Sequence, residues 1–294
     1  MTLVARSSLL GTFPAEASKL VVAGLRADGV AVRLNTSTES VRENDDGTFT
    51  LALQDQTPDG RSTVTADKVL VSTGRHPALE GLGLESLGFE AQDGQPLTLT
   101  TDCTGLVQGV PGTLDTPDEE GEDPWLYAVG DAAGSNFFTH QGKYEARATG
   151  DAIAARAKGE LSGTPAAWSR YAQTANQHAV PNVVFTDPEL AAVGRSVEQA
   201  KRDGYNVSSV ELPIQVSGSS LHSEHYEGWA QLVVDEDRRV LLGATFAGPD
   251  VGELLHAATI AVVGEVPLER LWHAVPSFPT VSEVWLRLLE KYGL

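Results

Sequence analysis

Residues 125–134 read WLYAVGDAAG and predict a short buried strand that ends in Gly130-Asp131 and turns into a segment opening a helix. A strand ending in Gly-Asp offers a carboxylate at the C-terminal edge of a sheet, where α/β proteins bind ligands. Backbone amides at the start of the following helix favour an anion such as a pyrophosphate. Two interpretations of Asp131 stay open: it contacts a ligand, or it caps the helix, since aspartate is also a preferred N-cap.

A second apolar run, Val69–Ser72, leads into Thr73-Gly74-Arg75. This run and Leu126–Val129 are continuously apolar, which predicts two strands of a parallel sheet covered on both faces. A packed helix is expected from Gly142 to Lys158. Its expected inward residues are Ala146, Ile153, Ala154 and Ala157, and its expected outward residues are Lys143, Arg147 and Arg156.

The N-terminal part shows the pattern of a nucleotide-binding unit. The expected elements are a strand at Thr2–Ala5, a helix from Pro14 to Asp28, a strand at Val30–Leu34 and a β-meander through Thr48–Leu53 and Ser62–Thr65. Apolar residues recur at the helical period in the helix, and Gly29 stands just past its end, where helices stop. The sequence therefore predicts an α/β fold of partial Rossmann-type units.

The pattern changes to α+β after a cluster of small and turn-forming residues at Ser162–Pro165, which we interpret as a linker. Gly228–Val234 and Arg239–Phe246 flank a polar turn and predict a hairpin. Helices are expected at Val251–Val263 and Val281–Tyr292, the second with one continuous apolar stripe.

Composition excludes several classes of partner. The 294 residues carry a formal net charge of −19, which repels phosphate backbones and anionic lipids, so neither nucleic acid nor membrane is an expected partner. The sequence contains no run of about 18 apolar residues, so no membrane-spanning helix is expected. No secretory signal is visible at Met1–Ser7. We therefore expect a cytoplasmic protein. Six acidic residues between Asp115 and Asp123 predict a solvated loop; a metal site there would lack any spacing signature.

Cys103 is the one cysteine of the chain. A single thiol makes no intrachain disulfide and indicates no zinc or iron–sulfur site. It lies in a segment expected to form a turn, and we interpret it as structural or incidental. No metal is expected.

Four segments together resemble the class I pyridine nucleotide-disulfide oxidoreductases, such as dihydrolipoamide dehydrogenase, mercuric reductase and soluble transhydrogenase. Residues 66–77 resemble the second flavin-domain signature, and Tyr127–Gly134 with Phe138-Thr139-His140 the flavin-ribityl motif and flavin-edge segment. Val180–Glu189 resembles the opening of the dimerisation domain, and Pro279–Glu283 its closing motif. The four segments occur in the order of the family and span essentially the whole chain.

The family also has two Gly-x-Gly-x-x-Gly turns and a Cys-x4-Cys pair, none of which occurs in this sequence. The chain therefore resembles the C-terminal portion of a longer flavoenzyme; a truncated gene model, an internal start and a split gene are equally open. The resemblance implies three parts: residues 1–65 from the NAD(P)-binding domain, 66–162 from the FAD-binding domain, and 163–294 forming an α+β dimerisation domain.

The resemblance implies a set of cofactor-binding residues. Gly130, Asp131 and Ala132 would meet the flavin ribityl chain, Thr139 and His140 its pyrimidine edge, and Thr73 with Gly74 would approach the cofactor closely. His140 is equally explained as a histidine whose ring is hydrogen-bonded at the start of a helix, and Arg75 as one partner of a surface ion pair. Arg6 follows the strand that meets the adenosine ribose, so it mildly favours the 2′-phosphate of NADP; an unpaired surface arginine is the alternative.

The closing motif departs from the family at one place. Disulfide reductases of the family have a histidine before the Pro-Thr, and Phe278 stands there. Glu283, which would orient that histidine, has two interpretations: a catalytic residue, or part of a capping box with Thr280. His273 lies five residues upstream of Phe278 and could replace the missing base if the loop reaches, or belong only to loop packing.

These observations predict an FAD-dependent NAD(P)H oxidoreductase that passes hydride through flavin to an unidentified small-molecule acceptor, since the cofactors themselves carry that chemistry. A homodimer through the C-terminal domain is expected. Two alternatives stay open: a non-catalytic dimerising remnant that binds no flavin alone, and a domain that binds a nucleotide without redox turnover.

Overall fold

The computed structural model describes residues 1–57, 59–91, 94–110 and 125–294. The acidic segment between residues 115 and 123 lies outside these ranges. The chain divides into two compact units, Met1–Val71 together with His178–Leu294, and Ser72–Gln177. The three-part division expected from the sequence stays a prediction.

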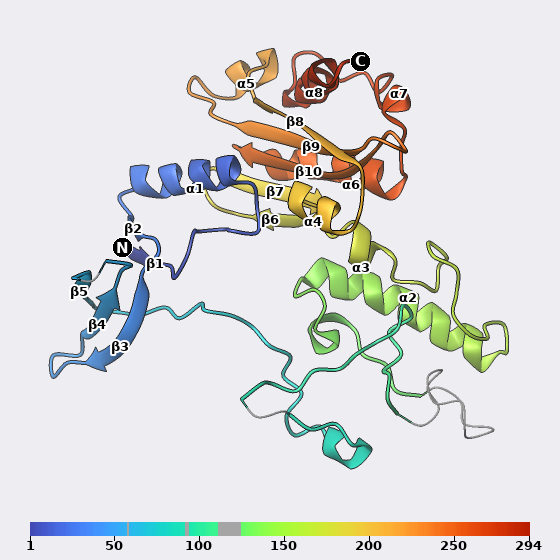
Figure 1. Cartoon of the computed structure of the whole chain (residues 1–294), viewed down its shortest axis with the longest axis horizontal. Coiled ribbons are helices and arrows are strands. Elements are labelled where there is room, and N and C mark those ends of the chain that lie inside the picture. The colour runs from blue at the N-terminus through green and yellow to red at the C-terminus, as the bar shows by residue number, and fades with distance from the viewer. Residues whose placement is uncertain (58, 92–93, 111–124) are drawn as a thin grey trace. The chain divides into compact units, whose positions relative to one another are not determined.

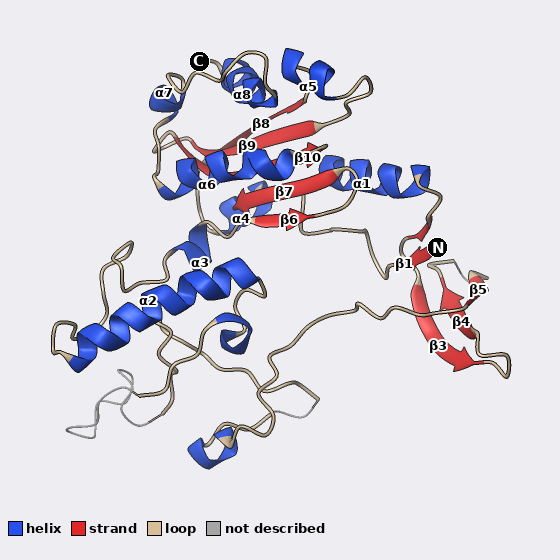
Figure 2. Cartoon of the chain, turned by 180° about the vertical axis from the view of Figure 1, so that it is seen from behind, coloured by secondary structure: helices blue, strands red, loops and turns tan. Residues whose placement is uncertain are grey.

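The N-terminal part of the first unit follows the predicted order. Strand β1 (Thr2–Val4) pairs in parallel with β2 (Ala31–Arg33), and helix α1 (Ala15–Ala27) connects them. Strands β3 (Ser37–Glu43), β4 (Phe49–Gln54) and β5 (Arg61–Ala66) form an antiparallel meander, visible as a separate small sheet in Figure 2. The sequence predicted each of these elements except β3, whose residues are mostly exposed and polar.

The C-terminal part of the same unit is built on a five-stranded antiparallel sheet. Its strands are β6 (Asn182–Val184), β7 (Glu189–Gly194), β8 (Val207–Pro213), β9 (Trp229–Asp235) and β10 (Val240–Gly248), in the spatial order β6-β7-β10-β9-β8. The predicted hairpin is confirmed as β9 and β10. Every residue of these two central strands is buried, so both faces of the sheet are covered at its centre.

Helices surround this sheet. They are α4 (Val197–Arg202), α5 (Ser217–His222), α6 (Leu255–Val263) after the 3-10 turn η3 (Val251–Leu254), α7 (Leu268–Leu271), and α8 (Val284–Tyr292) after η4 (Val281–Glu283). The predicted stripe of the last helix is confirmed, because Val284, Leu288 and Leu289 are buried. Trp285 lies beside Phe246 of β10, with 5.7 Å between ring centroids.

Helix α1 packs on the sheet of the same unit (Figure 1). Ala17 and Val21 form a buried cluster with Leu190, Trp229 and Ala247 from three strands. Phe246 and Ala247 are adjacent in β10 and point to opposite faces. The α1 cluster and the Trp285 contact therefore lie on opposite faces of the sheet.

The second unit contains one long helix and several short turns. Its elements are η1 (Leu84–Leu87), η2 (Gly130–Ala133), α2 (Thr139–Ala157) and the first residues of α3 (Ala175–His178). An apolar cluster forms its core; the buried members are Leu79, Leu84, Leu99, Val107, Val110, Ala128 and Ala133.

The prediction of two parallel strands in this region was wrong. Residues 69–72 form no strand, and Leu70 and Val71 are 91% and 72% exposed. In 126–129 only Tyr127 forms an isolated bridge, to Leu106. An apolar run becomes a strand only when a neighbouring segment accepts its backbone hydrogen bonds. The described residues provide no such neighbour for residues 69–72, and residues 126–128 pair only briefly with residues 105–107, in the antiparallel direction.

The buried face of α2 also differs from the prediction. Ala146, Ile153, Ala154 and Ala157 are exposed, whereas Gln141, Glu145, Ala148, Thr149, Ala152 and Ala155 are buried. Arg156, expected outward, points inward, and its side chain is only 9% exposed. Its guanidinium donates to Thr104 Oγ1 and to the Tyr127 hydroxyl, 3.0 Å each. Polar contacts, not apolar periodicity, decide which face of this helix is covered.

Candidate functional site

The Gly130–Asp131 turn lies a few residues before α2 in sequence and against its first turn in space. Gly130 has a φ of 62°, in the left-handed region that favours glycine. A Cβ on Gly142 of α2 would lie 3.2 Å from the Gly130 Cα. A side chain at position 142 would push the turn away by a few tenths of an ångström, so the two glycines favour this close approach.

Asp131 lies exposed in this turn. No hydrogen bond or ion pair joins its carboxylate to a described residue. It is not the N-cap of a helix: Val129 precedes η2, Phe138 precedes α2, and neither helix has a side-chain cap. The capping alternative was therefore wrong, and the carboxylate is available to an outside donor such as a hydroxyl. Ala132 is half-buried beside it.

Thr139 and His140 are the first two residues of α2, and both are exposed. The His140 ring stacks on Phe138, with 5.2 Å between centroids. The first amides of a helix have no partners within the helix, and they carry the positive end of its dipole. The structure thus places a carboxylate and a helix start within one short segment.

Thr73 and Gly74 lie in the exposed segment that precedes Pro77, and Gly74 has a φ of 155°. Arg75 holds this segment next to the site: its guanidinium donates to the Phe137 carbonyl at 2.9 Å and lies 5.7 Å from the Phe137 ring centroid. The surface ion pair considered for Arg75 is not what the structure shows. These contacts join residues 73–75 to the start of α2.

Glu145 of α2, which was not predicted as a site residue, supports the turn through hydrogen bonds. Its side chain is fully buried; one carboxylate oxygen accepts the Gly130 amide and the other accepts Asn176 Nδ2 at 2.8 Å. Burial raises the pKa of this carboxyl. No signal in the sequence marked it, because a charged residue in a helix is expected to point outward.

The residues predicted for catalysis lie in the other unit. Glu283 pairs with Arg287 at 2.6 Å, and its second oxygen is buried without a hydrogen-bond partner among the described residues. The predicted capping box is wrong, since the Thr280 hydroxyl donates to the Ser277 carbonyl instead. His273 is exposed, and no hydrogen bond joins its ring to Glu283.

Arg6 is exposed after β1 and makes no hydrogen bond or ion pair with a described residue. It could meet a phosphate, and the preference for NADP stays a prediction. Among the described residues, no group of three or more His, Cys, Asp or Glu side chains is arranged to hold a metal ion, and no helix is long and apolar enough to cross a membrane.

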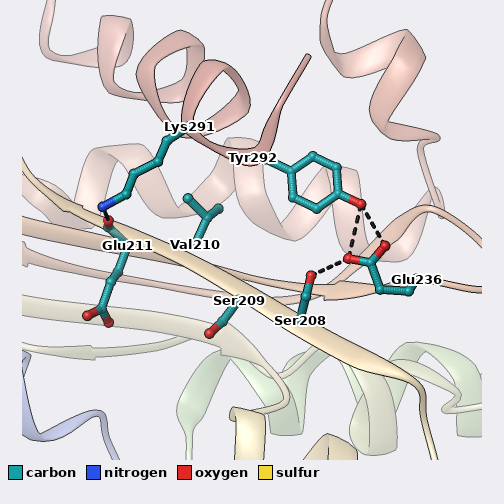
Figure 3. Close-up of a pocket in the computed structure, with 7 residues that line it drawn as sticks. All are labelled: Ser208, Ser209, Val210, Glu211, Glu236, Lys291 and Tyr292. Atoms are coloured by element: carbon teal, nitrogen blue, oxygen red, sulfur yellow. Dashed lines mark hydrogen bonds between the residues drawn. The ribbon is translucent and has the colours of Figure 1, made fainter.

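A surface pocket of about 590 Å³ lies between β8 and α8 (Figure 3) and contains none of the predicted site residues. It is lined by Ser208, Ser209, Val210, Glu211, Glu236, Lys291 and Tyr292. Ser208 and Tyr292 donate to Glu236, and Lys291 donates to the Glu211 carbonyl at 2.5 Å. These groups satisfy one another and fasten α8 to the edge strand, so the pocket is a structural feature.

Two family models match the sequence. Residues 1–159 match "Pyridine nucleotide-disulphide oxidoreductase", and residues 180–288 match the dimerisation domain of the same family.

Curated relatives include the dihydrolipoyl dehydrogenase of Bacillus subtilis, 27% identical over 96% of this chain and 53% of that protein. The corresponding enzyme of Thermus scotoductus is 30% identical over 91% of this chain and 51% of its own length. The chain thus spans about half the length of the curated relatives it matches.

Solved structures show the same fold. LpdA from Mycobacterium tuberculosis aligns with a TM-score of 0.74 at 21% identity, over 100% of this chain and 56% of that chain. The HOCl-induced flavoprotein disulfide reductase RclA from Escherichia coli aligns with a TM-score of 0.73 at 21% identity, over 98% and 58%.

Proposed function

Since the chain belongs to the pyridine nucleotide-disulphide oxidoreductase family, we propose that it supplies part of the flavin site and the dimerisation surface of an FAD-dependent NAD(P)H oxidoreductase. Members of this family use FAD and NAD(P)H. The observation that carries the proposal is the exposed Asp131 carboxylate, which has no hydrogen-bond or ion-pair partner among the described residues, at a glycine turn against the start of α2. The acceptor molecule is left unassigned.

The residues present fit one part of the flavin. Asp131 can accept hydrogen bonds from ribityl hydroxyls, and the first amides of α2 can donate to an electronegative edge. The bound flavin would supply hydride transfer. The chain's own residues bind and orient it: Gly130 and Gly142 let the turn approach the helix, and Arg75 holds residues 73–75 beside it.

Asp131→Asn tests the proposal. Titration of FAD into the purified chain, followed by quenching of flavin fluorescence, should show about tenfold weaker binding for the variant, because a hydrogen bond to a charged group contributes about 1.5 kcal/mol. Asp45→Asn, an exposed carboxylate after β3, is the matched control and should bind like the wild type. Equal affinity of all three proteins would remove Asp131 from the site.

The second candidate function is a dimerising chain that binds no flavin alone. The exposure of Leu70 and Val71 favours it, because apolar residues left uncovered mark a surface that another segment must cover. Addition of NAD(P)H to the chain mixed with FAD separates the two. Bleaching of the flavin absorption band supports the oxidoreductase, and an unchanged band with a stable dimer supports the second candidate.

Dimerisation through the C-terminal domain and a location in the cytoplasm are also part of the proposal. The family model over residues 180–288 supports the dimer. The catalytic role of His273 or Glu283 is not part of it, since the exposed His273 and the Arg287-paired Glu283 make no contact with each other.

A further inference from the structure

A buried polar network lies behind the Gly130–Asp131 turn. Asn176 is its centre: Nδ2 donates to Glu145 at 2.8 Å and to Gln173 at 3.3 Å, and Oδ1 accepts Gln141 Nε2 at 2.5 Å. Gln173 then donates to Thr149. The network connects α2 to residues 173–176, and among the described residues it reaches the turn through the bond from the Gly130 amide to Glu145.

Glu145 fixes the orientation of the Asn176 amide in this network. An ionised carboxylate accepts at both oxygens, so Gly130 and Asn176 both donate to it. If glutamine replaced it, the new amide nitrogen would face a donor at either place, the Gly130 amide or Asn176 Nδ2, so only one of the two bonds could remain. Asn176 cannot turn over without losing the bond that its oxygen accepts from Gln141. The network is therefore satisfied only by a carboxylate at position 145.

We propose that Glu145 is a positioning residue of the candidate flavin site: it holds the Gly130–Asp131 turn in the conformation that presents Asp131 to the ligand. This inference rests on the proposed function. It adds a residue that does not touch the ligand and acts through the Gly130 amide. Burying a carboxylate lowers the stability of the fold, because the charged group loses its hydration. The turn that Glu145 holds therefore explains its presence here better than packing does.

The ionisation of Glu145 gives the role a pH signature. Burial is the main cause that raises its pKa, and the Asp131 charge on η2 adds to the effect. The groups that face it from α2 and from residues 173–176 are the uncharged amides Gln141 and Asn176. Protonation of Glu145 removes the acceptor of one amide. As the pH falls, the turn should therefore loosen at a pH higher than the usual pKa range of a glutamate.

The first experiment follows the Gly130 amide by NMR in the chain labelled with 15N-glycine. In the wild type this amide should exchange slowly, and its shift should move with a single titration that is absent from Glu145→Gln. In Glu145→Gln its exchange should be at least about tenfold faster. Glu160→Gln, an exposed glutamate just after α2, is the matched control and should leave Gly130 unchanged.

The second experiment measures FAD affinity by fluorescence quenching. Glu145→Gln should bind about tenfold more weakly than wild type at neutral pH, and its affinity should lose the acid-side pH dependence that the wild type shows. A freed Gly130 amide with unchanged FAD affinity overturns the positioning role alone. Failure of the wild type itself to bind FAD overturns the proposed function and the positioning role with it. If Glu145→Gln does not fold, the titration of the wild-type Gly130 amide decides: a flat shift overturns the inference.

Discussion

Replacing Gly24 with alanine tests whether α1 lies on the five-stranded sheet. A Cβ at this position would stand 2.2 Å from the Asp187 carbonyl oxygen and 2.6 Å from Pro188 Cδ. The helix would have to move away by about 1.2 Å to restore ordinary contact, and overpacking of this kind costs up to about 3 kcal/mol. Alanine favours helix over glycine by about 1 kcal/mol. The expected net result is a loss of about 2 kcal/mol of unfolding free energy.

Gly150→Ala is the matched control. Gly150 lies in α2, is exposed, and a Cβ there would meet nothing within 4 Å. The same substitution should therefore stabilise that helix by up to about 1 kcal/mol. Urea unfolding followed by circular dichroism gives the free energies, and hydrogen exchange by mass spectrometry assigns each change to α1 or α2. If Gly24→Ala stabilises the protein as Gly150→Ala does, then α1 does not pack on the loop before β7.

Three further predictions concern the C-terminal domain. Trp285→Glu places a charge beside the Phe246 ring, 5.7 Å away in the wild type, and should dissociate the dimer or unfold the domain; light scattering that shows an unchanged dimer of unchanged stability refutes this placement. Phe278→His should alter the unfolding free energy measured in urea by less than about 0.5 kcal/mol, because the ring is 76% exposed; a larger loss would show that the ring is packed. The Tyr226 hydroxyl donates to Pro249 at 2.9 Å, and burial raises its pKa from 10.0 to about 12. A tyrosine whose pKa is raised in the folded state stabilises the fold below pH 10, and this contribution to stability is lost as the pH rises towards 12. Tyr226→Phe should lack that part of the stability loss at alkaline pH. Identical pH profiles of the unfolding free energy for the two proteins would contradict the assignment.

Elements with a regular local pattern of apolar and polar residues were predicted well. The β9–β10 hairpin, α1 and α8 follow from alternation, helical period and turn residues. Each buries its apolar residues against neighbours contained in the same unit, so local pattern and final packing agree. The Gly130–Asp131 turn was also found from sequence, because its glycine and aspartate stand directly between an apolar run and a helix.

The sequence could not reveal how that turn is supported. Glu145 and Arg156 are charged residues in a helix, and their composition favours an outward position. Both point inward because buried hydrogen-bond partners compensate their desolvation: the Gly130 amide and Asn176 for Glu145, and Thr104 with Tyr127 for Arg156. Those partners lie between 15 and 52 residues away along the chain, beyond the reach of any periodicity.

The sequence by itself determined α1, the β9–β10 hairpin, α8, the family and the Gly130–Asp131 turn, because the patterns that indicate them lie in residues close together in the chain. The tertiary structure alone decided that Val69–Ser72 forms no strand, that Glu145 supports the turn, and that Thr280 caps nothing. The physical reason is the same in each case. A backbone or side-chain polar group takes its conformation from the partner that satisfies it, and that partner is supplied, or withheld, by the folded chain.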